Sequence, residues 1–217
     1  MTVLDGKNEK NITLQELSDL AARYEKTVVD LGTGDGRNVY RKAKLNPDTL
    51  FIGIDPVRDN MLEISSKLKK KPAKGGLENV LLVIASAENM PCELESIAHC
   101  VTVLFPWGTL LEGIVKPTQQ ILGAVSFAAK DKADFEFITT YSDSCEEATI
   151  ENRGLPPLSI EYFNGDYRNI LKEKGFEIEN VELHGNEYVK SFDSMWAKRL
   201  AFGRKRDFYR ITGTINK

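Results

Sequence analysis

The segment VDLGTGDG (29–36) constrains the fold more than any other part of the chain. It joins an apolar run at 27–31, which predicts a short buried strand, to a helix expected at about 37–44. Glycines at a strand-to-helix turn let the backbone turn tightly and approach a ligand, because no Cβ stands in the way. The segment therefore predicts an α/β fold that holds a cofactor at this turn, with Gly32 and Gly34 in contact with it.

The rest of the chain continues the alternation of strands and helices. Strands are expected at 50–54, 80–85, 100–105, 135–140, 176–183 and 208–215, and helices at about 14–24, 57–71, near Glu93, at 118–129 and at 161–174. Such an alternation predicts a mostly parallel sheet covered on both faces, with ligands at the carboxyl ends of the strands. The two late strands, separated by a long excursion, predict an antiparallel addition at one side.

We expect the 217 residues to form one Rossmann-like α/β domain with seven strands, the last of them antiparallel. Residues 1–12 are expected to form an N-terminal β-hairpin around Asp5 and Gly6. Two insertions are expected, one at 141–158 after the fifth strand and one at 184–206 between the last two strands.

Composition narrows the classes of protein that remain. No apolar run approaches the roughly 20 residues of a membrane span, and the polar first ten residues do not suit a secretion signal. Three cysteines without CxxC spacing predict reduced thiols, and two histidines exclude a histidine-rich metal site. We therefore expect a cytoplasmic protein without a metal and without a membrane partner.

The charges of the glycine segment indicate which cofactor it binds. The dinucleotide pattern GxGxxG would need its third glycine at Arg37, whereas the third glycine here is Gly36. Asp30 and Asp35 suit the ammonium and sulfonium groups of S-adenosylmethionine better than a pyrophosphate. The pattern therefore favours this methyl donor, and NAD or another nucleotide is the alternative.

Two later strand ends fit the same cofactor. Asp55 closes the second strand of the alternation, where a carboxylate can accept hydrogen bonds from both ribose hydroxyls. As an isolated feature it would more often be a helix N-cap, but its position after the glycine segment favours ribose binding. Ala87 and Glu88 follow the third strand, where a small residue leaves room for adenine and a polar group can meet its amine. Together they predict the nucleoside half of the site.

The two tryptophans are candidates for binding the substrate. Trp107 follows a strand, between Pro106 and Gly108, which predict an exposed loop on whose indole a base could stack, although core packing is the alternative. Trp196 lies among cations, so RNA stacking and packing of an amphipathic helix fit equally well. Leu104 and Phe105 precede Pro106 and offer no acceptor for an amino group, which favours methylation of a ring nitrogen such as adenine N1.

The net charge of −3 conceals two basic segments. Residues 67–74 and 190–210 each carry a net charge of +5, which leaves −13 for the remainder. A single lysine run is often only a solvated face, but two such segments on an acidic protein favour a polyanionic partner.

Six segments together resemble the aminoglycoside-resistance 16S rRNA (adenine(1408)-N(1))-methyltransferases of the NpmA and KamB type. They are DLGTGDGRN (30–38), IGIDP (52–56), KKPAKGG (70–76), LFPWGTLL (104–111), TTYSDS (139–144) and WAKRLAFGRKR (196–206). The resemblance spans nearly the whole chain, and the two tryptophan-containing segments are the most specific. Ser66 departs from the pattern, where we would expect a lysine.

The resemblance implies a function and a set of site residues. It implies transfer of a methyl group from S-adenosylmethionine, leaving S-adenosylhomocysteine, to N1 of a flipped adenine in the 30S subunit, with aminoglycoside resistance as the consequence. The adenine would lie between Trp107 and Trp196. The cofactor would be held by Asp30, Gly32, Asn38, Asp55, Ala87, Glu88, Leu104, Trp107, Thr109, Ser194 and Trp196. Ribosomal RNA would meet Lys67, Lys70, Lys71, Glu146, Arg153, Arg199, Arg204 and Arg206.

Other interpretations stay open on the sequence alone. Glu146 beside Glu147 also fits a solvated pair, and Arg153 also fits a loop anchor. A methyltransferase of a small molecule or another RNA would leave the two basic segments without a purpose, and a ribosome-binding factor without catalysis would leave no methyl mark. We expect the protein to act as a monomer.

Overall fold

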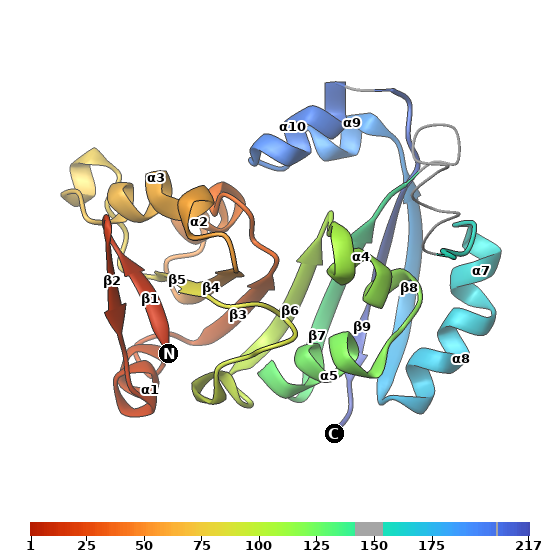
Figure 1. The fold of residues 1–217 in the computed structure, drawn as a ribbon, viewed down its shortest axis with the longest axis horizontal. Helices are drawn as coiled ribbons and strands as arrows, with labels where there is room; N and C mark the ends of the chain where they lie inside the picture. Colours follow the sequence, from red (N-terminus) through yellow and green to blue (C-terminus); the bar gives the residue numbers. More distant parts are fainter. Residues whose placement is uncertain (142–153, 203) are drawn as a thin grey trace.

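The computed structural model describes residues 1–141, 154–202 and 204–217. Its centre is one nine-stranded sheet in the order β2-β1-β5-β4-β3-β6-β7-β9-β8 (Figure 1). The strands are β1 Thr2–Asp5, β2 Asn8–Asn11, β3 Lys26–Leu31, β4 Thr49–Asp55, β5 Val80–Ile84, β6 Ala98–Leu104, β7 Ala129–Thr139, β8 Phe176–His184 and β9 Phe208–Ile215. Buried apolar residues such as Val29, Ile52 and Val101 fill the central strands, as parallel strands covered on both faces require.

The direction of the strands confirms the predicted fold class. The pairs β3–β4, β4–β5, β3–β6 and β6–β7 are parallel, whereas β9 lies antiparallel between β7 and β8. Seven strands thus form the mostly parallel sheet with an antiparallel last strand. The hairpin of β1 and β2 extends it, because Val3 of β1 pairs with Val83 of β5.

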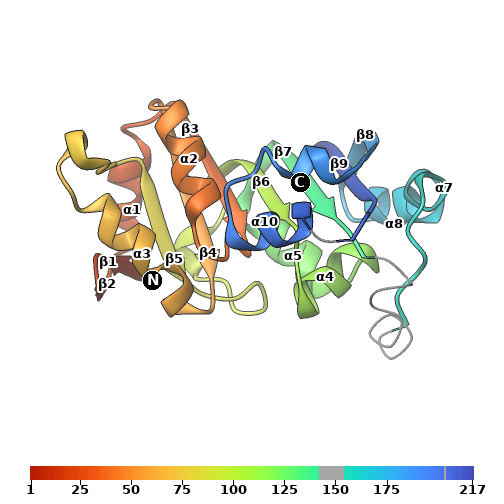
Figure 2. The same cartoon turned by 90° about the horizontal axis from the view of Figure 1, so that it is seen from above.

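Helices cover both faces of the sheet. Those described are α1 Leu14–Ala21, α2 Arg37–Leu45, α3 Arg58–Leu68, α4 Gly108–Val115, α5 Gln119–Ala128, α7 Ile160–Asn164, α8 Asp166–Glu173, α9 Asn186–Val189 and α10 Met195–Phe202, with 3-10 turns at Pro72–Lys74 and Cys92–Leu94. Leu17, Ile114 and Phe163 belong to one apolar cluster, whereas Tyr40 and Met61 belong to another. Figure 2 shows α2 and α10 on the same side of the sheet.

Two local structures differ from the sequence-based expectation. The exposed loop expected around Trp107 is short, because Gly108 already begins α4, which the sequence did not predict. The single helix expected at 161–174 is two helices that meet at Gly165, where an added Cβ would lie 2.9 Å from the carbonyl oxygen of Glu161. Gly108 is thus the first residue of a helix, and Gly165 is the junction between two helices; neither lies in a loop.

The topology fixes where a ligand can enter. β3 lies between β4 and β6, so the connections that leave β3 and β6 diverge at this point. Ligands of open α/β sheets bind in the crevice that forms at such a switch point. The glycine segment follows β3, the Trp107 segment follows β6, and α10 lies beyond the carboxyl end of β6 (Figure 1). Three segments distant in sequence therefore meet at one edge of the sheet.

Within the described part of the chain, no helix combines the length and the apolar character needed to cross a bilayer.

Candidate functional site

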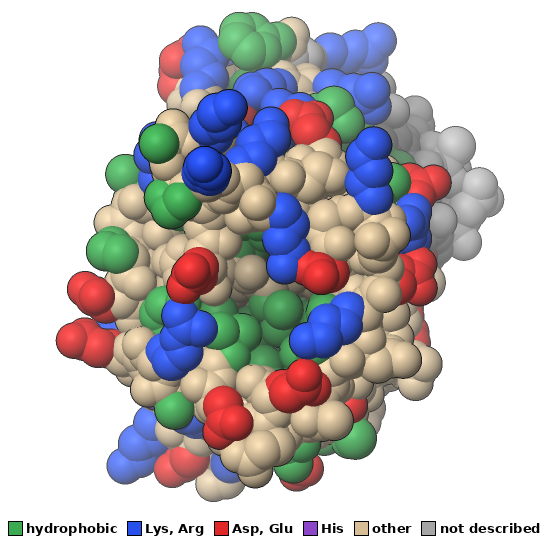
Figure 3. Space-filling model, turned by 90° about the vertical axis from the view of Figure 1, so that its left-hand side faces the viewer, with side chains coloured by type: hydrophobic (Ala, Val, Ile, Leu, Met, Phe, Trp, Pro, Cys, Tyr) green, Lys and Arg blue, Asp and Glu red, His purple; other side chains and the backbone are tan. Residues whose placement is uncertain are grey.

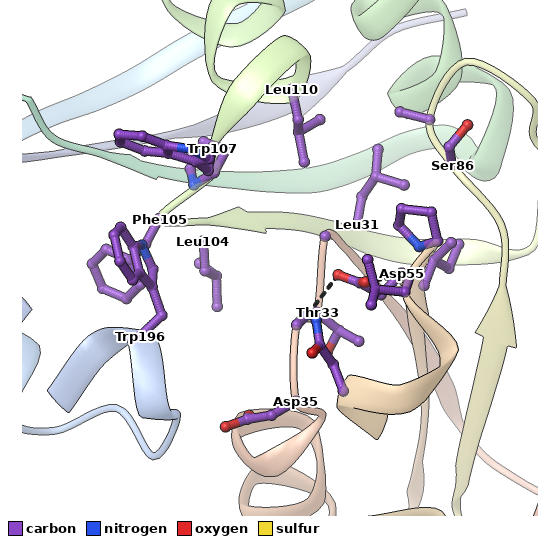
Figure 4. Close-up of a pocket in the computed structure, with 18 of the residues that line it drawn as sticks. Leu31, Thr33, Asp35, Asp55, Ser86, Leu104, Phe105, Trp107, Leu110 and Trp196 are labelled. Atoms are coloured by element: carbon purple, nitrogen blue, oxygen red, sulfur yellow. Dashed lines mark hydrogen bonds between the residues drawn. The ribbon is translucent and has the colours of Figure 1, made fainter. Parts of the chain in front are cut away.

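A cavity of about 520 Å³ opens at the switch point of the sheet. Its walls are the glycine segment, the end of β4, the segment after β5, the segment after β6 and the beginning of α10. Figure 4 shows the indoles of Trp107 and Trp196 at one end, and Asp55 and Ser86 at the other. The cavity thus has a polar end on the sheet and an aromatic end at its mouth.

The glycine segment forms the floor of the polar end. Gly32 has a φ of 78°, and a Cβ added there would lie 2.6 Å from Cδ2 of Leu110. Gly34 has a φ of 62°, and nothing lies within 4 Å of the corresponding position. The backbone N–H groups of Gly32 and Thr33 both donate to the carbonyl oxygen of Ile54, each at 2.9 Å. The segment is therefore anchored to β4 while its open side faces the cavity.

Asp55 is held in place by two backbone N–H groups. Gly34 N donates to Oδ2 at 3.0 Å, and Val57 N donates to Oδ1 at 2.9 Å. Burial raises the pKa of Asp55, and these two hydrogen bonds partly counteract that shift. Each oxygen keeps a second lone pair and Asp55 lines the cavity, so the carboxylate can also accept from a ligand hydroxyl. The capping contact to Val57 N and a ligand-binding role are therefore compatible.

Ala87 and Glu88 lie beside the polar end, where β5 stops. Ala87 lines the cavity and is half-buried. The hydroxyl of Thr109 donates to Oε1 of Glu88 at 2.6 Å, and this hydrogen bond lowers the pKa of Glu88. The first turn of α4 is therefore linked to the segment after β5 across the cavity.

Asp30 and Asn38 lie beneath the glycine segment rather than in the main cavity. Both border a small neighbouring cavity of about 20 Å³, together with Leu104 and Ser194, which also line the main cavity. Thr102 Oγ1 donates to Oδ1 of Asp30, and burial raises the pKa of this carboxyl group. Oδ1 of Asn38 is buried and accepts no hydrogen bond from the described residues. These two side chains therefore border a small space that adjoins the main cavity, because Leu104 and Ser194 line both.

The aromatic end joins two exposed indoles from different segments. Trp107 is 52% exposed and Trp196 is 38% exposed, so neither is a core residue. Their ring centroids are 5.7 Å apart, and the ring planes meet at 64°. Phe105, two residues before Trp107, adopts a φ of 52° and packs edge-on against Phe192, with the ring centroids 5.0 Å apart. This strained residue is buried, so it anchors the Trp107 segment next to the segment that leads into α10.

Nearly the whole chain matches a known protein family. A family model described as 16S rRNA (adenine(1408)-N(1))-methyltransferase matches residues 2–215. A relative of that name from Escherichia coli is 51% identical over 218 residues, which cover 100% of both chains. The chain belongs to the 16S rRNA (adenine(1408)-N(1))-methyltransferase family.

Solved structures of this methyltransferase family agree with the fold. A mutant of the family enzyme from Catenulisporales acidiphilia, crystallised with the cosubstrate SAM, matches with a TM-score of 0.90 and 31% identity, covering 100% of this chain and 97% of that chain. The aminoglycoside resistance methyltransferase NpmB1 matches with a TM-score of 0.83 and 32% identity, covering 99% and 100%. The predicted family and the predicted methyltransferase fold are confirmed.

The two basic segments of this family member lie around α10 and at the end of α3. Arg199 of α10 lines the cavity itself. On α3, Nζ of Lys67 lies 4.2 Å from the centroid of the Tyr40 ring, and Lys70 and Lys71 are exposed beyond the end of the helix. Figure 3 shows Lys and Arg side chains gathered along the upper part of the face that carries α3 and the hairpin. Glu146 and Arg153 lie outside the described residues.

Asn186 is a functional candidate that the sequence did not reveal. Its Nδ2 donates to the carbonyl oxygens of Leu200 at 3.0 Å and Arg204 at 3.1 Å, and its Oδ1 accepts from Arg206 N at 2.9 Å. One side chain at the start of α9 thus holds the backbone that carries two predicted RNA-binding arginines. Only the tertiary structure brings these residues together, so no local pattern could have indicated it.

Of the predicted cofactor-binding residues, the structure brings eight to the main cavity besides the two tryptophans. These are Gly32, Gly34, Asp55, Ala87, Glu88, Leu104, Thr109 and Ser194. Among the described residues, no cluster of three or more His, Cys, Asp or Glu side chains is arranged to hold a metal ion.

Proposed function

We propose that this chain transfers the methyl group of S-adenosylmethionine to N1 of adenine 1408 in 16S rRNA. The observation that carries the proposal is the pair of exposed indoles, Trp107 and Trp196, in contact with each other at the mouth of a cofactor-sized cavity. Family membership supplies the methyl donor and the nucleotide, and the position of the indoles supplies the means to hold a base.

The described residues fit S-adenosylmethionine at the polar end. Asp55 would accept from the ribose hydroxyls, the adenine moiety would lie along Ala87 and Glu88, and Thr109 and Leu104 would border the reactive end. The glycine segment, Ser194, Asp30 and Asn38 would surround the amino-acid portion. The buried, unpartnered oxygen of Asn38 supports this assignment, since such an atom ordinarily needs a donor, which an ammonium group provides.

The cofactor supplies a methyl carbon bonded to a positively charged sulfur. Adenine N1 carries an in-plane lone pair, so it forms a bond to that carbon as the sulfur–carbon bond breaks, and no proton has to leave. The positive charge passes to the base, and the faces of two flanking indoles stabilise it. The residues of this chain therefore act by position and stacking, without a general base, a covalent intermediate or a metal.

The carboxylates around the cavity are consistent with this mechanism. Asp35, Asp55 and Glu88 each accept hydrogen bonds from other groups, and Asp30 is buried against Thr102. A general base would have to be available to take a proton from the substrate. Each of these four side chains is better placed to hold the site together.

Adenine N1 lies on the Watson–Crick edge, so the target base has to leave its stack to reach the cavity. A base between two parallel rings needs centroids about 7 Å apart, because each contact layer takes about 3.5 Å. The indoles at 5.7 Å and 64° therefore have to separate and rotate. We infer that Trp107 and Trp196 close on each other in the free enzyme and open around the base.

The two basic segments support the assembled 30S subunit as the substrate. Lys67, Lys70 and Lys71 on one side and Arg199, Arg204 and Arg206 on the other would contact phosphates around the target. Such a substrate places the enzyme in the cytoplasm, and we propose that it acts as a monomer. A methyl group and a positive charge on the target base would disturb aminoglycoside contacts, which accounts for resistance.

Primer extension on 16S rRNA tests the proposal, because methylation of N1 stops reverse transcriptase. Subunits incubated with the enzyme and S-adenosylmethionine should give a stop at adenine 1408, while free 16S rRNA should give little. Methyl transfer to metabolites without any stop would favour a small-molecule methyltransferase. Binding to 30S subunits without a stop would favour a non-catalytic factor.

A further inference from the structure

Asp35 of the glycine segment contacts the distant helix α10. Its Oδ2 accepts a hydrogen bond from the backbone N–H of Met195 at 2.8 Å, across 160 positions of sequence. Its Oδ1 accepts from the backbone N–H of Arg37 at 3.1 Å, at the beginning of α2. The side chain is buried, so both hydrogen bonds are partly shielded from water. One carboxylate therefore links the beginnings of two helices.

The carboxylate of Asp35 provides a hydrogen-bond acceptor for the first turn of α10. The first N–H groups of a helix have no acceptor within the helix itself. Ser194 Oγ serves one of them by accepting from Ala197 N at 2.9 Å, and Asp35 serves that of Met195. A negative charge is also favourable at this position, where the helix dipole is positive. The beginning of α10 is thus capped partly from within and partly by the cofactor-binding segment.

The polar contact matters because the first turn of α10 is sparsely packed. Met195 is 53% exposed and Trp196 is 38% exposed, whereas Ala197, Leu200 and Ala201 are buried. Apolar packing therefore fixes the later part of the helix, and hydrogen bonds fix its start.

We propose that Asp35 is a positioning residue that holds Trp196 in register with the cofactor-binding segment. The proposal rests on the proposed function, since it assigns Trp196 to the target adenine. Movement of the glycine segment would be transmitted through Asp35 to Met195 and so to the neighbouring indole. The two halves of the site are then coupled: a cofactor that orders the segment also orders the wall that receives the base.

The competing role for Asp35 is direct contact with the positively charged cofactor, which its sequence position also suits. The structure favours the positioning role, because Nε of Arg37 lies 3.6 Å from Oδ2 of Asp35 and already faces its negative charge, and because the same oxygen accepts the backbone N–H of Met195. The two roles differ in what a substitution changes. A cofactor ligand controls cofactor affinity, whereas a positioning residue controls the mobility of Trp196 and the rate of transfer.

The experiment compares Asp35→Ala and Asp35→Asn with the control Glu63→Gln. Glu63 pairs with the same arginine, Arg37, at 2.6 Å, but it is exposed and does not contact α10. Asparagine keeps one acceptor oxygen, so it should retain part of the contact. Calorimetric titration with S-adenosylhomocysteine gives cofactor-site affinity, and single-turnover methylation of 30S subunits gives the rate.

A second readout follows Trp196 alone. The chain has two tryptophans, so Trp107→Phe leaves Trp196 as the sole indole emitter. In that background, Asp35→Ala should increase acrylamide quenching and lower the fluorescence anisotropy of Trp196, and Glu63→Gln should change neither. This readout needs no ribosome, so it stays informative even if the proposed substrate is wrong.

We expect Asp35→Ala to slow methyl transfer on the order of tenfold, because misplacement of a positioning wall lowers the rate without abolishing binding. Affinity for S-adenosylhomocysteine should change less than about threefold, with Asp35→Asn between wild type and Asp35→Ala. Parallel loss of affinity and rate, with unchanged Trp196 fluorescence, would overturn the proposal in favour of a cofactor ligand. Unchanged rate and fluorescence would overturn it as well. Far-ultraviolet circular dichroism confirms that each variant is folded.

Discussion

The two ends of the cavity are built in different ways. At the polar end, Asp55 and the glycine segment are fixed by backbone hydrogen bonds to and from parallel strands. At the aromatic end, Trp107 and Trp196 come from a loop and from an inserted helix; both are exposed, and their rings contact each other. We infer from this difference that the proposed cofactor half is preorganised on the sheet, whereas the proposed base-binding half would have to open to admit its ligand.

The largest effect that would sharpen this comparison is expected at the aromatic end. Trp196→Ala should reduce the rate of methyl transfer on the order of a hundredfold, because it removes one stacking face and the alignment of N1. Cofactor affinity should stay within about threefold of wild type. Single-turnover methylation of 30S subunits and calorimetric titration measure the two quantities.

Two control variants show whether the effect of Trp196→Ala comes from loss of the flat ring at this position. Trp196→Phe keeps a flat ring and should retain an intermediate rate. Phe202→Ala removes an aromatic side chain of the same helix that is 79% exposed and does not line the cavity, so its rate should match wild type. If Phe202→Ala slowed transfer as much as Trp196→Ala, the effect would belong to the helix surface in general.

At the polar end, the next largest effect should come from Asp55. Asp55→Ala should weaken cofactor binding about tenfold or more, through the loss of a charged acceptor. Because burial raises the pKa of Asp55, its carboxylate protonates at a higher pH than an exposed aspartate. Wild-type affinity should therefore fall as the pH is lowered through that raised pKa, whereas Asp55→Asn should lack this dependence. Titrations across pH check this, and a parallel fall in both proteins would contradict it.

The smallest expected effects concern binding to the 30S subunit. They distinguish an arginine that contacts RNA from a residue that only holds the backbone of the arginine segment in place. Arg204→Ala should weaken binding to the 30S subunit and lower the salt slope by about one, since one phosphate contact is lost. Asn186→Ala should weaken binding a few-fold with little change in slope, because the cations remain but their backbone loses its hydrogen bonds. Binding measured over a series of salt concentrations distinguishes them, and equal slopes would be the contrary result.

Most of the polar end could be predicted from sequence. The glycine segment and the segment with Ala87 and Glu88 follow strands, Asp55 ends one, and the carboxyl ends of parallel strands meet at one edge. The alternation of strands and helices also predicted the parallel sheet and the antiparallel last strand. These features could be predicted because each depends on a short local sequence pattern, and the parallel topology then fixes where that pattern lies in the folded chain.

The remaining features depend on contacts between distant residues. The sequence assigned Asp35 to the cofactor, but it cannot show the hydrogen bond to Met195, 160 residues away. Asn186 likewise meets Arg204 and Arg206 only in the folded chain. The helix α4 was missed because Gly108, beside a proline and a tryptophan, is typical of a loop although here it begins a helix. The sequence alone left Trp196 equally compatible with core packing.

The separation of the two indoles in a complex with the 30S subunit and a non-reactive cofactor analogue tests the central claim most directly. Electron cryomicroscopy of that complex should show adenine 1408 unstacked between Trp107 and Trp196, with the ring centroids moved from 5.7 Å to about 7 Å and the rings nearly parallel. Indoles that remain in mutual contact while the adenine stays stacked in the RNA, or binds elsewhere on the enzyme, would contradict the account.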